Sequence, residues 1–240
     1  MKKIILKIIC SSFLLFLFIG CSDNNPGPSN DASVSFFAEL TSPNIKPLLI
    51  KNSYQIEKSF IDSIQISKLR ILVSELKLFS DKDDSTSSGK MIKAEPFVIS
   101  LDSTGQIVEI SSNTSVNVGV FEKIKFEIHR LSTSDLSKYA NDLIFEPFAT
   151  QDRFSIIIDG KVYVQGNQSH FSYKSNLTTN LLLKIEPGII LTANTSAKIS
   201  IQINPTAIFK TNNDIIDPRE VKNFSFIDNA IKLSIKAIKK

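Results

Sequence analysis

The feature that most constrains the fold is an alternation of apolar and polar side chains with a period of two residues. It is cleanest over 123–129, where Ile124, Phe126 and Ile128 alternate with charged or polar residues. Successive side chains of a β-strand point to opposite faces of a sheet, so this pattern predicts a strand with one buried face. Residues 197–203 alternate in the same way. The middle of the chain is therefore expected to form half-buried β-strands.

One long apolar segment changes its parity part-way along. Ile64 and Ile66 alternate on even positions, whereas Leu69 and Ile71 alternate on odd positions. A regular strand cannot move its apolar side chains to the other face, so the segment predicts a β-bulge near 67–68.

Short strands with tight turns are expected along most of the remaining chain. Asp159-Gly160 and Pro187-Gly188 have the composition of hairpin turns. The gaps between predicted strands lack crossover helices, which parallel neighbours require. The sequence therefore predicts an all-β fold, an antiparallel β-sandwich of prealbumin-like or immunoglobulin-like type. Its further strands are expected at 33–38, 97–101, 107–110, 115–118, 154–158, 161–165, 170–175 and 181–185.

The end of the chain changes to a helical period. Asp228 can cap a short C-terminal helix over about 229–239, in which Ile231 and Ile235 share one face. The alternation of Ile231, Leu233 and Ile235 leaves a strand as the alternative.

The first 20 residues have the layout of a bacterial export signal. Three lysines precede the apolar run 8–19, which is too short for a spanning helix. Residues 17–21 resemble a lipobox, so the signal peptide 1–20 is expected to be removed and Cys21 to carry diacylglycerol and palmitate. An ordinary secreted protein cut at another residue, or an uncleaved anchor, is the alternative. The polar stretch 21–32 is expected to be a disordered tether to a single domain over 33–240.

Localisation and charge follow from this leader. Ser22 is compatible with transport to the outer membrane of a Gram-negative bacterium, and the protein is expected to be periplasmic or surface-exposed, held to the membrane by its lipid. The leader contains three lysines and no acidic residue, so its removal reduces the net charge of +4 to about +1. No nucleic-acid partner is expected. Loss of Cys10 and acylation of Cys21 exclude disulfides and thiol chemistry in the body.

Several segments together resemble one family of bacterial lipoproteins, which is built on a domain of unknown function with a predicted prealbumin-like sandwich. The family has no established activity, so the resemblance implies a fold and a location. The chain departs from the family at Gly119-Val120-Phe121, where members usually have Gly-x-Tyr. The resemblance is carried, in the order expected for the family, by Ile61–Ser63 with Ile71–Lys77, Val118–His129, Phe171–Ser175, Asp217-Pro218, and Ile227–Lys232 with Lys236-Ala237.

A calcium site and a solvated hairpin tip are the two interpretations of one acidic loop. Asp81, Asp83 and Asp84 could offer oxygen ligands to a hard cation. An EF-hand counted from Asp81 would need Gly and Glu where the chain has Thr86 and Ile92, so that motif is absent. The hairpin tip is favoured, and no metal or other cofactor is assigned.

Catalytic motifs are missing from the chain. His129 and His170 are predicted to lie on the polar faces of strands without metal-ligand spacing, and no Gly-x-Ser-x-Gly occurs. No catalytic residue is assigned, and the protein is expected to be a non-enzymatic, membrane-anchored binding or structural module. Its loops 81–89 and 132–147 are the expected contact surfaces for a protein or glycan partner, and exposed edge strands could also add to a strand of a partner.

The alternative function is a carbohydrate-binding or glycan-degrading accessory lipoprotein. Sugar binding commonly uses exposed aromatic rings, and the chain has no Trp. Of its four tyrosines, Tyr54 and Tyr139 remain candidate platforms, while Tyr163 and Tyr173 are predicted to pack beside core positions.

Overall fold

The computed structural model describes residues 31–41, 48–51, 61–80, 89–210 and 214–240. The described residues are mostly β-strand, which confirms the all-β prediction. The strands are β1 (Asp31–Leu40), β2 (Leu48–Lys51), β3 (Ser63–Ser80), β4 (Lys90–Lys93), β5 (Phe97–Asp102), β6 (Val108–Asn117), β7 (Gly119–Ile128), β8 (Ile156–Val164), β9 (Asn167–Ser175), β10 (Thr179–Leu191), β11 (Ser196–Ile203) and β12 (Ile235–Lys239). The helices are α2 (Leu136–Tyr139), α3 (Pro205–Phe209), η2 (Val221–Asn223) and α4 (Phe224–Ser234).

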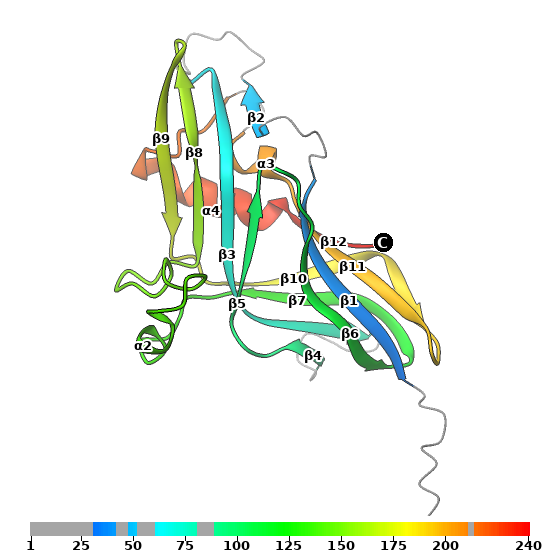
Figure 1. Ribbon diagram of the computed structural model, residues 1–240. Helices are drawn as coiled ribbons and strands as arrows, with labels where there is room; N and C mark the ends of the chain where they lie inside the picture. Colours follow the sequence, from blue (N-terminus) through cyan, green and yellow to red (C-terminus); the bar gives the residue numbers. More distant parts are fainter. Residues whose placement is uncertain (1–30, 42–47, 52–60, 81–88, 211–213) are drawn as a thin grey trace, which may run out of the picture.

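The strands form one curled sheet in the order β6-β1-β11-β12-β10-β7-β3-β8-β9, with β2, β4 and β5 also paired to β3 (Figure 1). Most pairs are antiparallel, but β1 is parallel to β11 and β10 is parallel to β12. The predicted purely antiparallel sheet is therefore wrong. The crossover between β10 and β12 consists of β11 and the helical segments, so no single helix between two strands announces it.

β3 is the strand that joins the two parts of the sheet. Its first part pairs with β8 and its second part pairs with β7. The register shifts between Ile66 and Lys68, which confirms the predicted bulge. Ile64, Leu69 and Ile71 are all fully buried, because the bulge returns the apolar side chains to the same core.

Two predicted turns lie inside strands. Asp159-Gly160 belongs to β8, and Pro187-Gly188 belongs to β10, where the pairing with β7 is interrupted between Lys184 and Ile189. The β8–β9 turn falls at Gln165-Gly166, where both residues have positive φ angles, close to the turn expected between the strands 161–165 and 170–175. The strands expected at 107–110 and 115–118 form the single strand β6.

The boundaries at both ends of the described body differ from expectation. β1 begins at Asp31, so the last two residues of the predicted tether 21–32 belong to a strand. The helix predicted over 229–239 is α4, which begins at Phe224 and ends at Ser234, and β12 replaces the predicted second half. Asp228 therefore lies inside the helix and is not its N-cap, a position that Asn223 occupies. β12 forms a five-residue antiparallel ladder with β11, and this tertiary pairing overrides the helical pattern.

α4 covers the inner face of β9, behind the sheet in Figure 1. Ile227 and Ile231 lie in the main core, and Asp228 accepts hydrogen bonds from Tyr173 and Ser175, both at 2.6 Å. On the opposite face of β3 and β8, the excursion between β7 and β8 buries a second cluster around Leu72 and Phe148. Among the described residues, no helix is long and apolar enough to cross a membrane.

Candidate binding groove between β10 and β12

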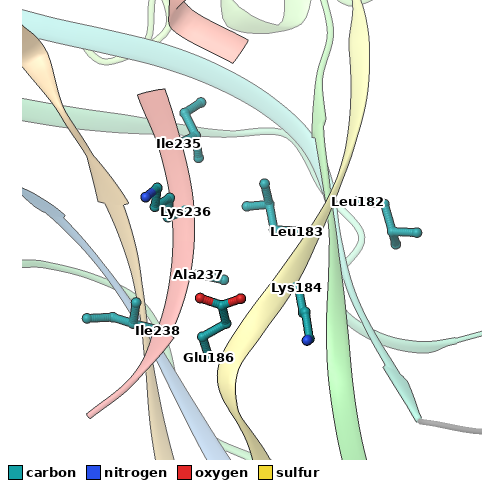
Figure 2. Close-up of a pocket in the computed structure, with 8 residues that line it drawn as sticks. All are labelled: Leu182, Leu183, Lys184, Glu186, Ile235, Lys236, Ala237 and Ile238. Carbon is teal, nitrogen blue, oxygen red and sulfur yellow. The ribbon is translucent and has the colours of Figure 1, made fainter. Parts of the chain in front are cut away.

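The described surface contains a groove of about 320 Å³ at the point where β10 and β12 separate. The two strands pair at only two positions, Ile185 with Ala237 and Glu186 with Ile238. Figure 2 shows their ribbons close together near Glu186 and spread apart toward Leu182 and Ile235. The groove is therefore a wedge in the sheet.

The pairing preferences of the two strands produce this wedge. The residues 179–184 of β10 form a continuous antiparallel ladder with β7, and 235–239 of β12 form one with β11. Each ladder satisfies one edge of its strand. Within the described residues, no strand pairs with the opposite edge of 179–184, so backbone N–H and C=O groups there face the wedge unpaired by a neighbouring strand.

The inner side of the wedge is apolar. Ile235 and Ala237 are 4% and 1% exposed, and the partly buried Leu183 packs against the same core. Figure 2 shows Leu183 pointing into the space between the strands and Leu182 pointing to the other side of β10. This division follows from strand geometry, because consecutive side chains occupy opposite faces.

The outer side of the wedge is charged. Lys184 and Glu186 on β10 and Lys236 on β12 are exposed and line the groove. Lys184 also lies directly opposite Lys123 of β7 in the ladder. Like charges facing one another across a strand pair are destabilising, so the three ammonium groups give this face an unbalanced positive charge.

In a neighbouring cluster, by contrast, each lysine is paired with a carboxylate. On β3 and β7, Lys125 donates to Glu75 at 2.7 Å and lies 3.1 Å from Glu127, and Lys77 lies 3.0 Å from Glu75. Burial alone would raise the pKa of Glu75, but the hydrogen bonds from Lys125 and Lys77 outweigh it and lower the pKa to about 2. Within the described residues, no such ion pair joins Lys123, Lys184 or Lys236 to a carboxylate.

The residues singled out from the sequence lie elsewhere. Cys21 and the calcium candidates Asp81, Asp83 and Asp84 fall outside the described residues. The described residues contain no group of three or more His, Cys, Asp or Glu side chains placed to hold a metal ion. His129 and His170 are exposed, on or next to the different strands β7 and β9, as predicted for surface histidines.

The loops and tyrosines proposed as contact surfaces are partly accounted for by packing. Tyr173 is fully buried, Tyr139 stacks on Phe145 at 4.4 Å between ring centroids, and Tyr163 donates to Gln65. Tyr54 and residues 81–88 lie outside the described residues. The excursion 132–147 does present two adjacent exposed apolar side chains, Leu143 and Ile144, which are 93% and 60% exposed.

The groove was not predicted from the sequence. The apolar run Leu181–Leu183 next to Lys184 is the local signal, but it is equally consistent with an ordinary strand. The wedge forms because β10 pairs with β7 and β12 pairs with β11, and these partner strands are distant in the chain.

Comparison with known proteins yields no relative. No protein-family model matches the chain, and neither a curated protein nor a solved structure is significantly similar to it.

Proposed function

We propose that this protein is a membrane-anchored lipoprotein of the bacterial envelope, in the outer membrane, whose folded body is a non-catalytic binding module with the β10–β12 groove as its contact site. The observation that carries the binding role is the groove itself, which combines a free strand edge, an apolar inner side and unpaired ammonium groups. These are the features of a surface that recognises an extended, partly apolar ligand.

The anchor rests on the leader. The lipobox-like residues 17–21 follow a charged start and an apolar run, and only nine residues, 22–30, separate Cys21 from the first strand. Two or three acyl chains on such a cysteine would give lasting membrane attachment. The folded body would then be presented next to the membrane surface.

The curled sheet brings strands from its two parts into one core. We regard the curled sheet as a distorted prealbumin-like sandwich, because residues of β1 and β11 share one core with residues of β3 and β8. Membership of the lipoprotein family named above would fit this arrangement.

A glycan-binding role is the second candidate, and the groove supports it less well. Stacking on sugars needs an accessible ring face. The groove is lined by aliphatic, lysine and glutamate side chains.

Metabolic labelling with radioactive palmitate tests the anchor directly. In a Gram-negative host the wild-type chain should incorporate label and Cys21→Ala should not, because the thiol of Cys21 is the acylation site. Cys10→Ala is the matched control, since it changes the only other cysteine, and it should keep the label. Absence of label from the wild type, or equal label in Cys21→Ala, would contradict the proposal.

A further inference from the structure

We infer that the β10–β12 groove binds an extended peptide segment of a partner protein, which adds a strand to the free edge of β10 and carries apolar and acidic side chains in alternation. This inference rests on the binding role proposed above and specifies its partner.

The unpaired backbone edge of β10 determines what kind of ligand can bind there. The stretch 179–184 is paired with β7 on one side, and its last three residues, Leu182–Lys184, line the groove on the other side. Six residues of strand extend about 20 Å. A ligand that satisfies such an edge must itself offer alternating N–H and C=O groups in extended conformation, which is the property of a peptide strand.

The faces of the wedge determine which side chains that peptide carries. A strand beside β10 places every second side chain on the inner face, next to Leu183 and Ile235, where apolar groups are buried. Its other side chains lie on the outer face with Lys184 and Lys236. The inner positions therefore favour aliphatic residues of moderate size.

Charge complementarity determines the outer positions. Lys184 and Lys236 line the groove with a single carboxylate, on Glu186, and Lys123 lies opposite Lys184 in the ladder with β7. An acidic side chain placed between Lys184 and Lys236 would be attracted to both ammonium groups. A basic side chain at the same place would be repelled by both. The edge thus selects against basic strands and in favour of acidic ones.

A fluorescent hexapeptide with alternating Val and Glu is the probe, titrated against the full chain in detergent and followed by fluorescence anisotropy. We expect it to bind at least about tenfold more tightly than the same peptide with Lys in place of Glu, because the exposed charges differ in sign. A peptide of three Val followed by three Glu has the same composition without the alternation. We expect this block peptide to bind at least about tenfold more weakly as well.

The double substitution Lys184→Glu with Lys236→Glu should reverse the preference, so that the Val–Lys peptide binds more tightly than the Val–Glu peptide. Lys198→Glu is the matched control, because Lys198 is an exposed lysine on the neighbouring strand β11, and it should leave both affinities unchanged. Melting curves of both variants check that the fold is retained.

Equal affinity for the alternating and block peptides would overturn the inference, because the groove would then recognise charge without a strand. Unaltered preference in the double variant would overturn it too, as would self-association of the chain that protects the same edge without peptide. These results leave the palmitate experiment unaffected, so a wrong partner can be distinguished from a wrong anchor.

Discussion

The structural role of Gly160 cannot be inferred from its neighbours in the sequence alone. Asp159-Gly160 has hairpin composition, but it lies inside β8 opposite Ile66, next to the bulge of β3. A Cβ at position 160 would overlap the carbonyl oxygen of Gln65 and lie 2.7 Å from the Phe171 ring. The glycine is there because two backbones approach closely, which no local pattern reveals.

Gly160→Ala should therefore lower the free energy of unfolding by about 1–3 kcal/mol, the usual cost of overpacking a core. Gly188→Ala is the control, since its Cβ would meet atoms only at 3.5 Å, and it should change stability by less than about 0.5 kcal/mol. Urea denaturation measures both. Equal effects of the two substitutions would refute the close approach at Gly160.

Stability at alkaline pH should depend on Tyr173, because its hydroxyl is buried and donates a hydrogen bond to Asp228. Burial and the neighbouring carboxylate raise the pKa of Tyr173 well above its usual value. Above about pH 10 the unfolded chain loses this proton and the folded chain keeps it. Stability is therefore fully present below pH 10 and should fall by up to about 1.4 kcal/mol per pH unit above it.

Tyr173→Phe should remove that alkaline dependence while lowering stability at neutral pH by about 1–2 kcal/mol, through the lost hydrogen bond. Tyr163→Phe, which removes the half-exposed hydroxyl bonded to Gln65, should retain the dependence. Urea midpoints between pH 9 and 11 measure this. An unchanged alkaline slope in Tyr173→Phe would rule out Tyr173 as its source.

α4 and β12 show two periods in one continuous segment. Ile231 is fully buried and Leu233 is 82% exposed, as a helix requires, whereas from Ile235 onward alternate residues are buried, as a strand requires. The helix interpretation was correct as far as Ser234, and the strand interpretation of Ile231, Leu233 and Ile235 was correct only at Ile235, where β12 begins. The change occurs where pairing with β11 becomes possible.

Ile231→Ala should therefore destabilise the protein by about 2–4 kcal/mol, because it leaves a cavity in the main core. Leu233→Ala should change stability by less than about 0.5 kcal/mol, because that side chain is mostly solvated. Thermal or urea unfolding gives both values. Similar losses for the two variants would mean that both side chains are buried, as in a strand.

For the whole molecule, features that depend on residues close together in the chain could be predicted from the sequence, whereas features that depend on distant residues could not. Alternation such as that of Ile124, Phe126 and Ile128 is local, so β7 and the bulge in β3 were predicted, whereas the short strands β2 and β4 were not. The parallel pair β1–β11 joins residues that are more than 150 positions apart, such as Val34 and Ala197. No local pattern specifies that pairing.

The candidate site belongs to the long-range class. Leu183 and Ile235 meet in one groove only because β7 and β11 have taken the other edges of their strands. Of the loops expected to make contact, 132–147 contributes no residue to the groove, and 81–88 lies outside the described residues, as does Cys21.

Hydrogen exchange of the full chain, with and without the Val–Glu peptide, tests whether β10 offers a free edge to an extended peptide. Among the described strands, β6 and β9 end the main path of the sheet, and β2, β4 and β5 pair only with β3, so these five strands are the competing edges. We expect the peptide to slow exchange in 179–184 and to leave 108–117 and 167–175 unchanged, because the new strand forms hydrogen bonds only along β10. Protection confined to β6 or β9, or no protection in β10 at a peptide concentration that saturates binding, would contradict it.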